Sequence, residues 1–145
     1  MKKGIILTND PGNDNKVSLE ITSASSKIIP KLEDGKITMK IMIKEYGNLG
    51  DQSDSTDLTS PKILEALEKQ KASLIKNEVL SAFKKAQLLD ADVFGFGDII
   101  YQKYPDKWRY LEDSWDETFK DISIDVVVEA KLRGSGKITK PITSD

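Results

Sequence analysis

The chain of 145 residues contains no cysteine and no histidine, and it has no long apolar run. The absence of cysteine excludes disulfides, a thiolate nucleophile and zinc–sulfur sites. The absence of histidine removes the commonest general base and the commonest metal ligand. No segment approaches the roughly 18 apolar residues that cross a bilayer. We therefore predict no enzyme activity, no metal site and no cofactor.

The charge of the chain is nearly balanced, with 22 Lys and Arg against 24 Asp and Glu and a formal net charge of −2. Proteins that bind the phosphate backbone of nucleic acids carry a basic surface, and none is evident here. Nucleic acid is therefore not expected as a partner. The apolar residues recur periodically, which predicts a single folded domain over residues 1–145.

Alternation of apolar and polar residues predicts three strands, at residues 17–29, 36–46 and 122–132, and a short apolar run bounded by turn residues predicts another at residues 4–8. Pro30 should end the second strand because proline cannot donate in a ladder. The second and third strands should form an antiparallel hairpin with lysines on one wet face. Solvation is favoured over membrane contact for these lysines. The last strand should pair with strand 36–46 or with strand 4–8.

Helical periodicity after Ser60 predicts one long amphipathic helix over residues 61–89. Ser60 should supply the N-cap hydroxyl, with Pro61 at the first helical position. Asp90 or Asp92 should cap a second helix, which carries Phe94, Phe96, Ile99 and Ile100 and ends by Tyr104.

A third helix should run from Pro105 to Leu111. The capping-box spacing of Ser114 and Glu117 predicts one more helical turn, ending near Phe119.

The order β-β-β-α-α-α-β predicts an α+β fold. An antiparallel sheet of three to four strands should pack on the long helix, with short helices at one edge. Residues 47–60 should be a flexible loop, and residues 137–145 a loose tail. Three aspartates in that loop, at positions 51, 54 and 57, lack the spacing and the distal Glu of a calcium loop.

The segment from Asp90 to Asp98 contains three aspartates and the sequence Gly95-Phe-Gly97. A dinucleotide fingerprint requires a preceding strand and a third glycine, and both are missing. Two glycines in a helix, each costing about 0.5–1 kcal/mol relative to alanine, indicate close packing. Capping by Asp92 and exposure of Asp98 are favoured over paired catalytic acids. The structural motif comprises Ser60, Asp92, Phe94, Gly95, Phe96 and Gly97.

Aromatic residues gather between residues 101 and 119. Core packing is the simpler interpretation, because aromatic rings dominate cores by buried area. The alternative is a partner-binding surface, since Trp, Tyr and Arg are enriched in interface hot spots. The candidate partner-binding residues are Tyr101, Tyr104, Trp108, Arg109, Tyr110 and Trp115.

Several segments, in order along the chain, match one known family. They are Val17-Ser-Leu-Glu-Ile21, Ala24-Ser-Ser-Lys-Ile28, Asp34-Gly-Lys-Ile-Thr-Met-Lys-Ile41, Ala86-Gln-Leu-Leu-Asp-Ala-Asp-Val-Phe-Gly-Phe-Gly-Asp98, Tyr104-Pro-Asp-Lys-Trp108, Ser114-Trp-Asp-Glu-Thr-Phe119 and Ile124-Asp-Val-Val-Val-Glu129. The sequence resembles the C-terminal domain of the GerAC-like family, the C-subunit lipoproteins of spore germinant receptors.

The resemblance implies a non-enzymatic subunit of a nutrient receptor that starts germination of the dormant spore. In that family a lipid tethers the subunit to the spore inner membrane, beside two integral-membrane subunits, A and B. Because this chain has no cysteine to carry a lipid, we expect it to be the soluble C-terminal domain of a longer lipoprotein. The resemblance supplies no catalytic residues.

Two roles stay open at this point. The domain could dock on the A and B subunits through the long helix or the aromatic residues. It could instead bind the germinant directly, which would require a concave pocket with a few polar groups.

Overall fold

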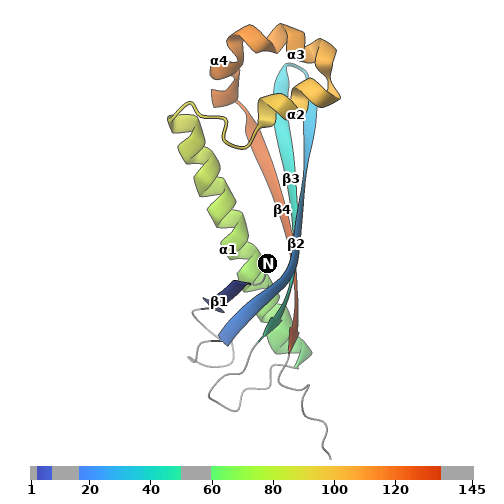
Figure 1. Cartoon of the computed structure of the whole chain (residues 1–145), viewed down its shortest axis with the longest axis vertical. Helices are drawn as coiled ribbons and strands as arrows, with labels where there is room; N and C mark the ends of the chain where they lie inside the picture. The colour runs from blue at the N-terminus through green and yellow to red at the C-terminus, as the bar shows by residue number, and fades with distance from the viewer. Residues whose placement is uncertain (1–2, 8–16, 50–59, 135–145) are drawn as a thin grey trace, which may run out of the picture. The chain divides into compact units, whose positions relative to one another are not determined.

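The computed structural model describes residues 3–7, 17–49 and 60–134 (Figure 1). Its elements are β1 (Lys3–Leu7), β2 (Val17–Glu33), β3 (Lys36–Leu49), α1 (Pro61–Leu88), α2 (Phe96–Lys103), α3 (Pro105–Leu111), the 3-10 turn η1 (Glu112–Ser114), α4 (Trp115–Lys120) and β4 (Ser123–Gly134). The predicted α+β class is confirmed. The long helix, the third helix and all four strands lie within a few residues of the predicted positions.

The predicted loop and tail fall largely on residues 50–59 and 135–145, which lie outside the described ranges, as do the three loop aspartates. The first three loop positions, Gly47 to Leu49, belong to β3, so the predicted start of the loop is wrong. Leu49 is buried, which explains why the strand continues to it. At the start of α1 the Ser60 carbonyl accepts a 2.9 Å hydrogen bond from the Leu64 N–H, the first bond of the helix.

The strand order of the sheet is β1-β2-β3-β4. β1 pairs antiparallel with β2, and a two-residue turn at Asp34 and Gly35 connects β2 to β3. Both turn residues have positive φ, 50° and 77°, which is typical of tight hairpin turns. β4 pairs with β3, and the two strands run in the same direction (Figure 1), which the helical connection between them allows. The sheet is therefore mixed, and the prediction of a purely antiparallel sheet is wrong.

β2 continues through Pro30 to Glu33, so the prediction that Pro30 ends this strand is wrong. Among the described residues, β1 pairs with β2 between Val17 and Ile21. At Pro30 the strand therefore lies at the edge of the sheet, where a missing N–H removes no ladder bond. The Pro30 side chain is buried, so packing favours its place in the strand.

The chain forms two compact units, and β2, β3, β4 and α1 each contribute residues to both. The first unit comprises residues 1–25, 43–75 and 128–145. Its core is built on Leu19, Leu49 and Leu67, which come from β2, β3 and α1. Partly buried apolar residues pack around it: Ile21, Ile63, Leu64 and Leu132. The apolar stripe of α1 thus covers the strands in this unit.

Polar side chains of α1 also reach the interior of the first unit. Lys71 is only 7 % exposed, and its Nζ lies 3.9 Å from Glu45 Oε1 on β3. Glu68 Oε2 accepts a 2.9 Å hydrogen bond from the Leu132 N–H of β4. Because β4 is the last strand of the sheet, Glu68 satisfies a donor at an exposed edge.

The second unit comprises residues 26–42 and 76–127. Its buried apolar residues are Ile37, Met39, Ile41, Phe83, Ala86, Phe96, Ile100, Phe119, Ile122 and Val126. On β3 they alternate with the exposed Lys36 and Lys40 and the half-buried Thr38, which confirms the predicted face of the sheet. The three short helices and the end of α1 belong to this unit, and so do all candidate site residues except Ser60.

Candidate functional site

Helix α1 ends in a Schellman motif. The Ala91 N–H donates to the Ala86 carbonyl at 3.0 Å, and the Asp90 N–H donates to the Gln87 carbonyl at 3.2 Å. Asp90 has a φ of 55°, the left-handed conformation that glycine commonly adopts at this position. Asp90 therefore ends the long helix and does not cap the next one.

Asp92 stabilises the beginning of α2. Its Oδ1 accepts a 2.9 Å hydrogen bond from the Phe96 N–H, and its Oδ2 accepts a 2.8 Å bond from the Gly97 N–H. These amides have no partner within the helix, because they belong to its first turn. The N-cap position is occupied by Gly95, which has a φ of 75°. Capping by Asp92 is thus confirmed, and Phe94, predicted to lie in the helix, precedes it.

Two indole rings pack against the start of α2. Trp115 Nε1 donates to Asp92 Oδ2 at 3.2 Å, and the ring centroids of Trp108 and Trp115 are 5.1 Å apart. A Cβ atom on Gly97 would lie 2.9 Å from Trp108 Cη2 and 3.1 Å from Trp115 Nε1. Gly97 therefore leaves room for both indoles, which confirms the close packing predicted for this glycine. For Gly95 the prediction is wrong, because a Cβ there would meet no atom within 4 Å and its positive φ is what favours glycine.

All four phenylalanines of the chain form one cluster. Phe83 of α1 lies 5.9–6.0 Å, between ring centroids, from Phe94, Phe96 and Phe119. The cluster continues into the indole pair, because the ring centroids of Trp115 and Phe119 are 6.2 Å apart. We call the four phenylalanines and two tryptophans the aromatic corner.

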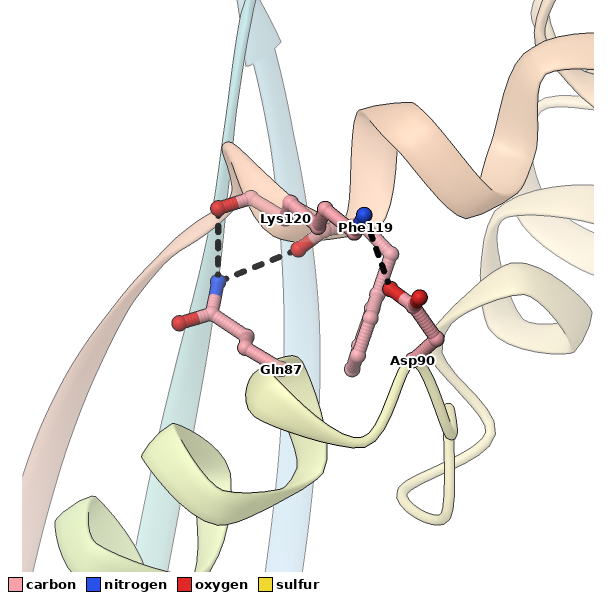
Figure 2. Close-up of polar contacts among 4 residues, drawn as sticks. All are labelled: Gln87, Asp90, Phe119 and Lys120. Carbon is pink, nitrogen blue, oxygen red and sulfur yellow. Dashed lines mark hydrogen bonds and ion pairs between the residues drawn. The ribbon is translucent and has the colours of Figure 1, made fainter.

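Polar contacts fix the end of α1 on the junction between α4 and β4 (Figure 2). Gln87 Nε2 lies 3.1 Å from the carbonyl oxygens of Phe119, Lys120 and Ile122, so its two hydrogens are shared among three acceptors. Lys120 Nζ lies 3.3 Å from Asp90 Oδ1. The side chains of Gln87 and Asp90 therefore hold the α4–β4 junction, next to Phe119 of the aromatic corner, against the end of α1.

Ser114 occupies the N-cap position of α4, as predicted, but its hydroxyl makes no capping hydrogen bond. The predicted capping box is therefore wrong. The 3-10 turn η1 runs directly into α4, and the Trp115 N–H already donates to the Glu112 carbonyl. The Ser114 carbonyl accepts a 3.0 Å bond from Thr118 Oγ1.

Replacing Gln87 by leucine is expected to lower the free energy of unfolding by about 1–2 kcal/mol, because the carbonyls lose their shared donor. Urea denaturation followed by circular dichroism measures this change. Gln102→Leu is the matched control, since the Gln102 amide bonds to Asp98 on the exposed surface of one helix. The control should change the free energy by less than about 0.5 kcal/mol. Equal losses in both variants would contradict a role for the Gln87 contacts.

The structure separates the six candidate partner-binding residues. Half-buried are Tyr104, Trp108 and Trp115. Tyr110 is 86 % exposed and Tyr101 is 55 % exposed, and the Arg109 side chain is also exposed. The two indoles belong to the aromatic corner, so the two exposed tyrosines and Arg109 offer the accessible surface.

A groove of about 660 Å³ lies beside Tyr110. Three elements line it: the β2–β3 turn with Asp34 and Lys36, helix α3 with Lys107 and Tyr110, and the α4–β4 junction with Asp121. The turn residues were not among the sequence candidates, because nothing in their local pattern signals that α3 lies opposite them.

A second hollow of about 550 Å³ lies beside Tyr101 and the two indoles, with Asp92 and Asp98 in its lining. Asp98 is exposed, as predicted, and accepts a 2.9 Å bond from Gln102 Nε2. In the described ranges no group of acidic side chains is arranged to hold a metal ion. Nor does any helix of the described part have the length and apolar character needed to cross a membrane.

Comparison with known proteins places these features in a family. Residues 1–136 match the family model described as spore germination B3/GerAC like, C-terminal. Spore germination protein KC of Bacillus subtilis (strain 168) is 32 % identical over 127 residues, which cover 87 % of this chain and 31 % of that protein. Spore germination protein B3 of the same strain is 27 % identical over 139 residues, covering 94 % of this chain and 37 % of the relative.

The chain thus spans about a third of the length of these relatives, 31 % and 37 %. A crystal structure of the GerBC protein has the same fold, with a TM-score of 0.78 and 23 % sequence identity. The match covers 91 % of this chain and 40 % of that one. The family match over almost the whole sequence, together with this shared fold, shows that the chain belongs to the spore germination B3/GerAC-like family.

Proposed function

We propose that this domain is a non-enzymatic part of a nutrient germinant receptor and acts in spore germination through protein–protein contacts. Its partners are the integral-membrane A and B subunits of the receptor, in the spore inner membrane. A lipid anchor outside this chain holds the full-length protein there. Membership of a spore germination family supports the process, and the surface described next supports the mode of action.

The observation that carries this proposal is the exposed Tyr110 at the groove between the β2–β3 turn and α3. Its ring is 86 % exposed although it adjoins a concave surface of about 660 Å³. Interface hot spots are enriched in tyrosine and are surrounded by a polar rim. Charged residues from both sides of the groove line it beside Tyr110: Glu33, Asp34, Lys36, Lys107 and Asp121.

Replacing Tyr110 by alanine is expected to weaken co-purification of the full-length protein with the A and B subunits about tenfold or more. The free energy of unfolding of the domain should change by less than about 0.5 kcal/mol, because the ring is exposed. Tyr46→Ala on β3 is the control, since Tyr46 is exposed in the other unit and should leave co-purification unchanged. Unchanged co-purification of the Tyr110 variant would count against docking through this groove.

Direct germinant binding is the second candidate, and the same groove favours it. Its volume of about 660 Å³ lies within the range of about 300–1,000 Å³ that is usual for ligand pockets. Lysine and aspartate side chains line it together, so it offers charges of both signs to a small polar molecule. Titration calorimetry of the 145-residue domain with amino acids and sugars tests this role. Absence of heat across the panel would reject it for this domain.

A further inference from the structure

Three aliphatic side chains protrude from the turn between α1 and α2. Leu88 is 80 % exposed, Leu89 is 66 % exposed and Val93 is 74 % exposed. We call these three residues the aliphatic tip. Single exposed apolar residues are common on protein surfaces, whereas three exposed aliphatic residues within six positions concentrate apolar surface at one turn. None of the three lines either of the two hollows described above.

The tip is held rigidly in its exposed position. The Schellman hydrogen bonds fix the turn, and the ion pair between Asp90 and Lys120 ties it to α4. Gln87, one residue before Leu88, is bonded to three carbonyl groups at the α4–β4 junction, and Figure 2 shows the bonds to Phe119 and Lys120. These contacts therefore fix the backbone that carries Leu88 and Leu89.

The charges around the tip favour an anionic partner. Lys84 and Lys85 are exposed and lie four residues before Leu88 and Leu89, so each lysine shares a helix face with one leucine. Asp90 pairs with Lys120, so these two charges offset each other. Asp92 accepts bonds only from neutral donors, two amides and an indole N–H, and so keeps its negative charge. Lys84 and Lys85 outweigh that one carboxylate, so these five charged groups together are net positive.

We infer that the aliphatic tip inserts into the interfacial layer of an anionic lipid bilayer, with Lys84 and Lys85 at the headgroups. Side chains that enter a bilayer interface are apolar, and flanking lysines extend toward anionic headgroups. A protein-binding hot spot would be rich in Trp, Tyr or Arg, whereas Leu and Val are under-represented there. The tip contains only Leu and Val. This contact is separate from docking through the Tyr110 groove and does not depend on it.

Vesicle flotation of the 145-residue domain tests the inference. Binding is expected on vesicles that contain phosphatidylglycerol and much less on phosphatidylcholine alone. A variant with both Leu88→Ser and Leu89→Ser should bind vesicles about tenfold or more weakly, because it lacks two apolar side chains whose transfer from water to lipid favours binding. Lys84→Gln with Lys85→Gln should remove the preference for phosphatidylglycerol. Leu74→Ser is the control, since Leu74 is a 45 % exposed leucine of the same helix outside the tip.

A second measurement reports insertion directly. The chain has no cysteine, so Leu89→Cys provides one site for an environment-sensitive fluorophore such as NBD. Its emission should shift to the blue with vesicles that contain phosphatidylglycerol. A label at Lys44→Cys, on the exposed face of β3, should show no shift.

Two results would overturn the inference: equal vesicle binding by the wild-type and serine variants, or no shift of the label at position 89. If the variant with Leu88→Ser and Leu89→Ser still bound vesicles but no longer co-purified with the A and B subunits, the tip would instead be identified as a protein contact. Because the Tyr110 variant tests docking separately, failure of one proposal leaves the result of the other readable.

Discussion

Replacement of Gly97 by valine is expected to lower the free energy of unfolding by about 3 kcal/mol. A Cβ atom here would lie 2.9 Å from Trp108 Cη2 and 3.1 Å from Trp115 Nε1. Both indoles border the hollow beside Tyr101, but moving away from position 97 would break the contact between the two rings and the hydrogen bond from Trp115 to Asp92. The added side chain must therefore displace the indoles or the first turn of α2. Urea denaturation measures the loss, and tryptophan fluorescence of the folded protein reports the displaced rings.

A double-mutant cycle distinguishes this clash from a general effect of losing glycine. Phenylalanine has no atom equivalent to Trp108 Cη2, so Gly97→Ala should cost less in a Trp108→Phe background, by about 1 kcal/mol. Gly35→Ala is the matched control, because Gly35 has a φ of 77° and a Cβ atom added there would meet no atom within 4 Å. That substitution costs backbone strain of about 1–2 kcal/mol but should not couple to position 108. Strict additivity between positions 97 and 108 would contradict the proposed contact.

Features that depend on neighbours in the sequence could be predicted well. The alternation of Ile37, Met39 and Ile41 with polar residues placed β3 correctly, because side chains of a strand point to opposite faces. The long helix followed from its apolar spacing and from Pro61 at its start. The hairpin between β2 and β3 followed from the same alternation on both sides of a short turn.

Features that depend on distant parts of the chain could not be predicted. Lys71 belongs to a helix rich in exposed lysines, and its burial depends on Glu45, which β3 brings within 3.9 Å. Pro30 stays in β2 because of its place at a sheet edge, which the sequence does not specify. The parallel pairing of β4 with β3 depends on the path of the helices between them.

The candidate site shows the same division. The N-cap preference of aspartate suggested Asp92, but its third donor, the indole of Trp115, comes from a different helix. The aromatic cluster was visible as composition, yet composition cannot separate the exposed Tyr110 from the half-buried Trp108. The aliphatic tip was hidden, because Leu89 continues the apolar stripe predicted for the helix, yet α1 ends before it and Leu89 is exposed.

Replacement of Asp92 by alanine should be about as damaging as the change at Gly97, with a loss of about 3 kcal/mol. The carboxylate accepts bonds from the Phe96 and Gly97 amides at 2.9 and 2.8 Å and from Trp115 Nε1 at 3.2 Å. Each donor left without a partner in a partly buried site costs about 1–3 kcal/mol, and losing a helix cap alone costs about 1 kcal/mol. Urea denaturation measures the total.

Asparagine at position 92 separates the contributions of the two carboxylate oxygens. Asparagine keeps one acceptor oxygen but places an NH₂ group toward the other donors. The free energy of unfolding of this variant should therefore fall between those of the wild type and the alanine variant. Asp98→Ala is the matched control, because Asp98 is exposed and bonds only to Gln102 among the contacts described, and it should cost less than about 0.5 kcal/mol. A Trp115→Phe background should reduce the cost of Asp92→Ala, since one donor is already gone. If the cost were unchanged there, the indole bond would contribute nothing, and Asp92 would act only as the cap of α2.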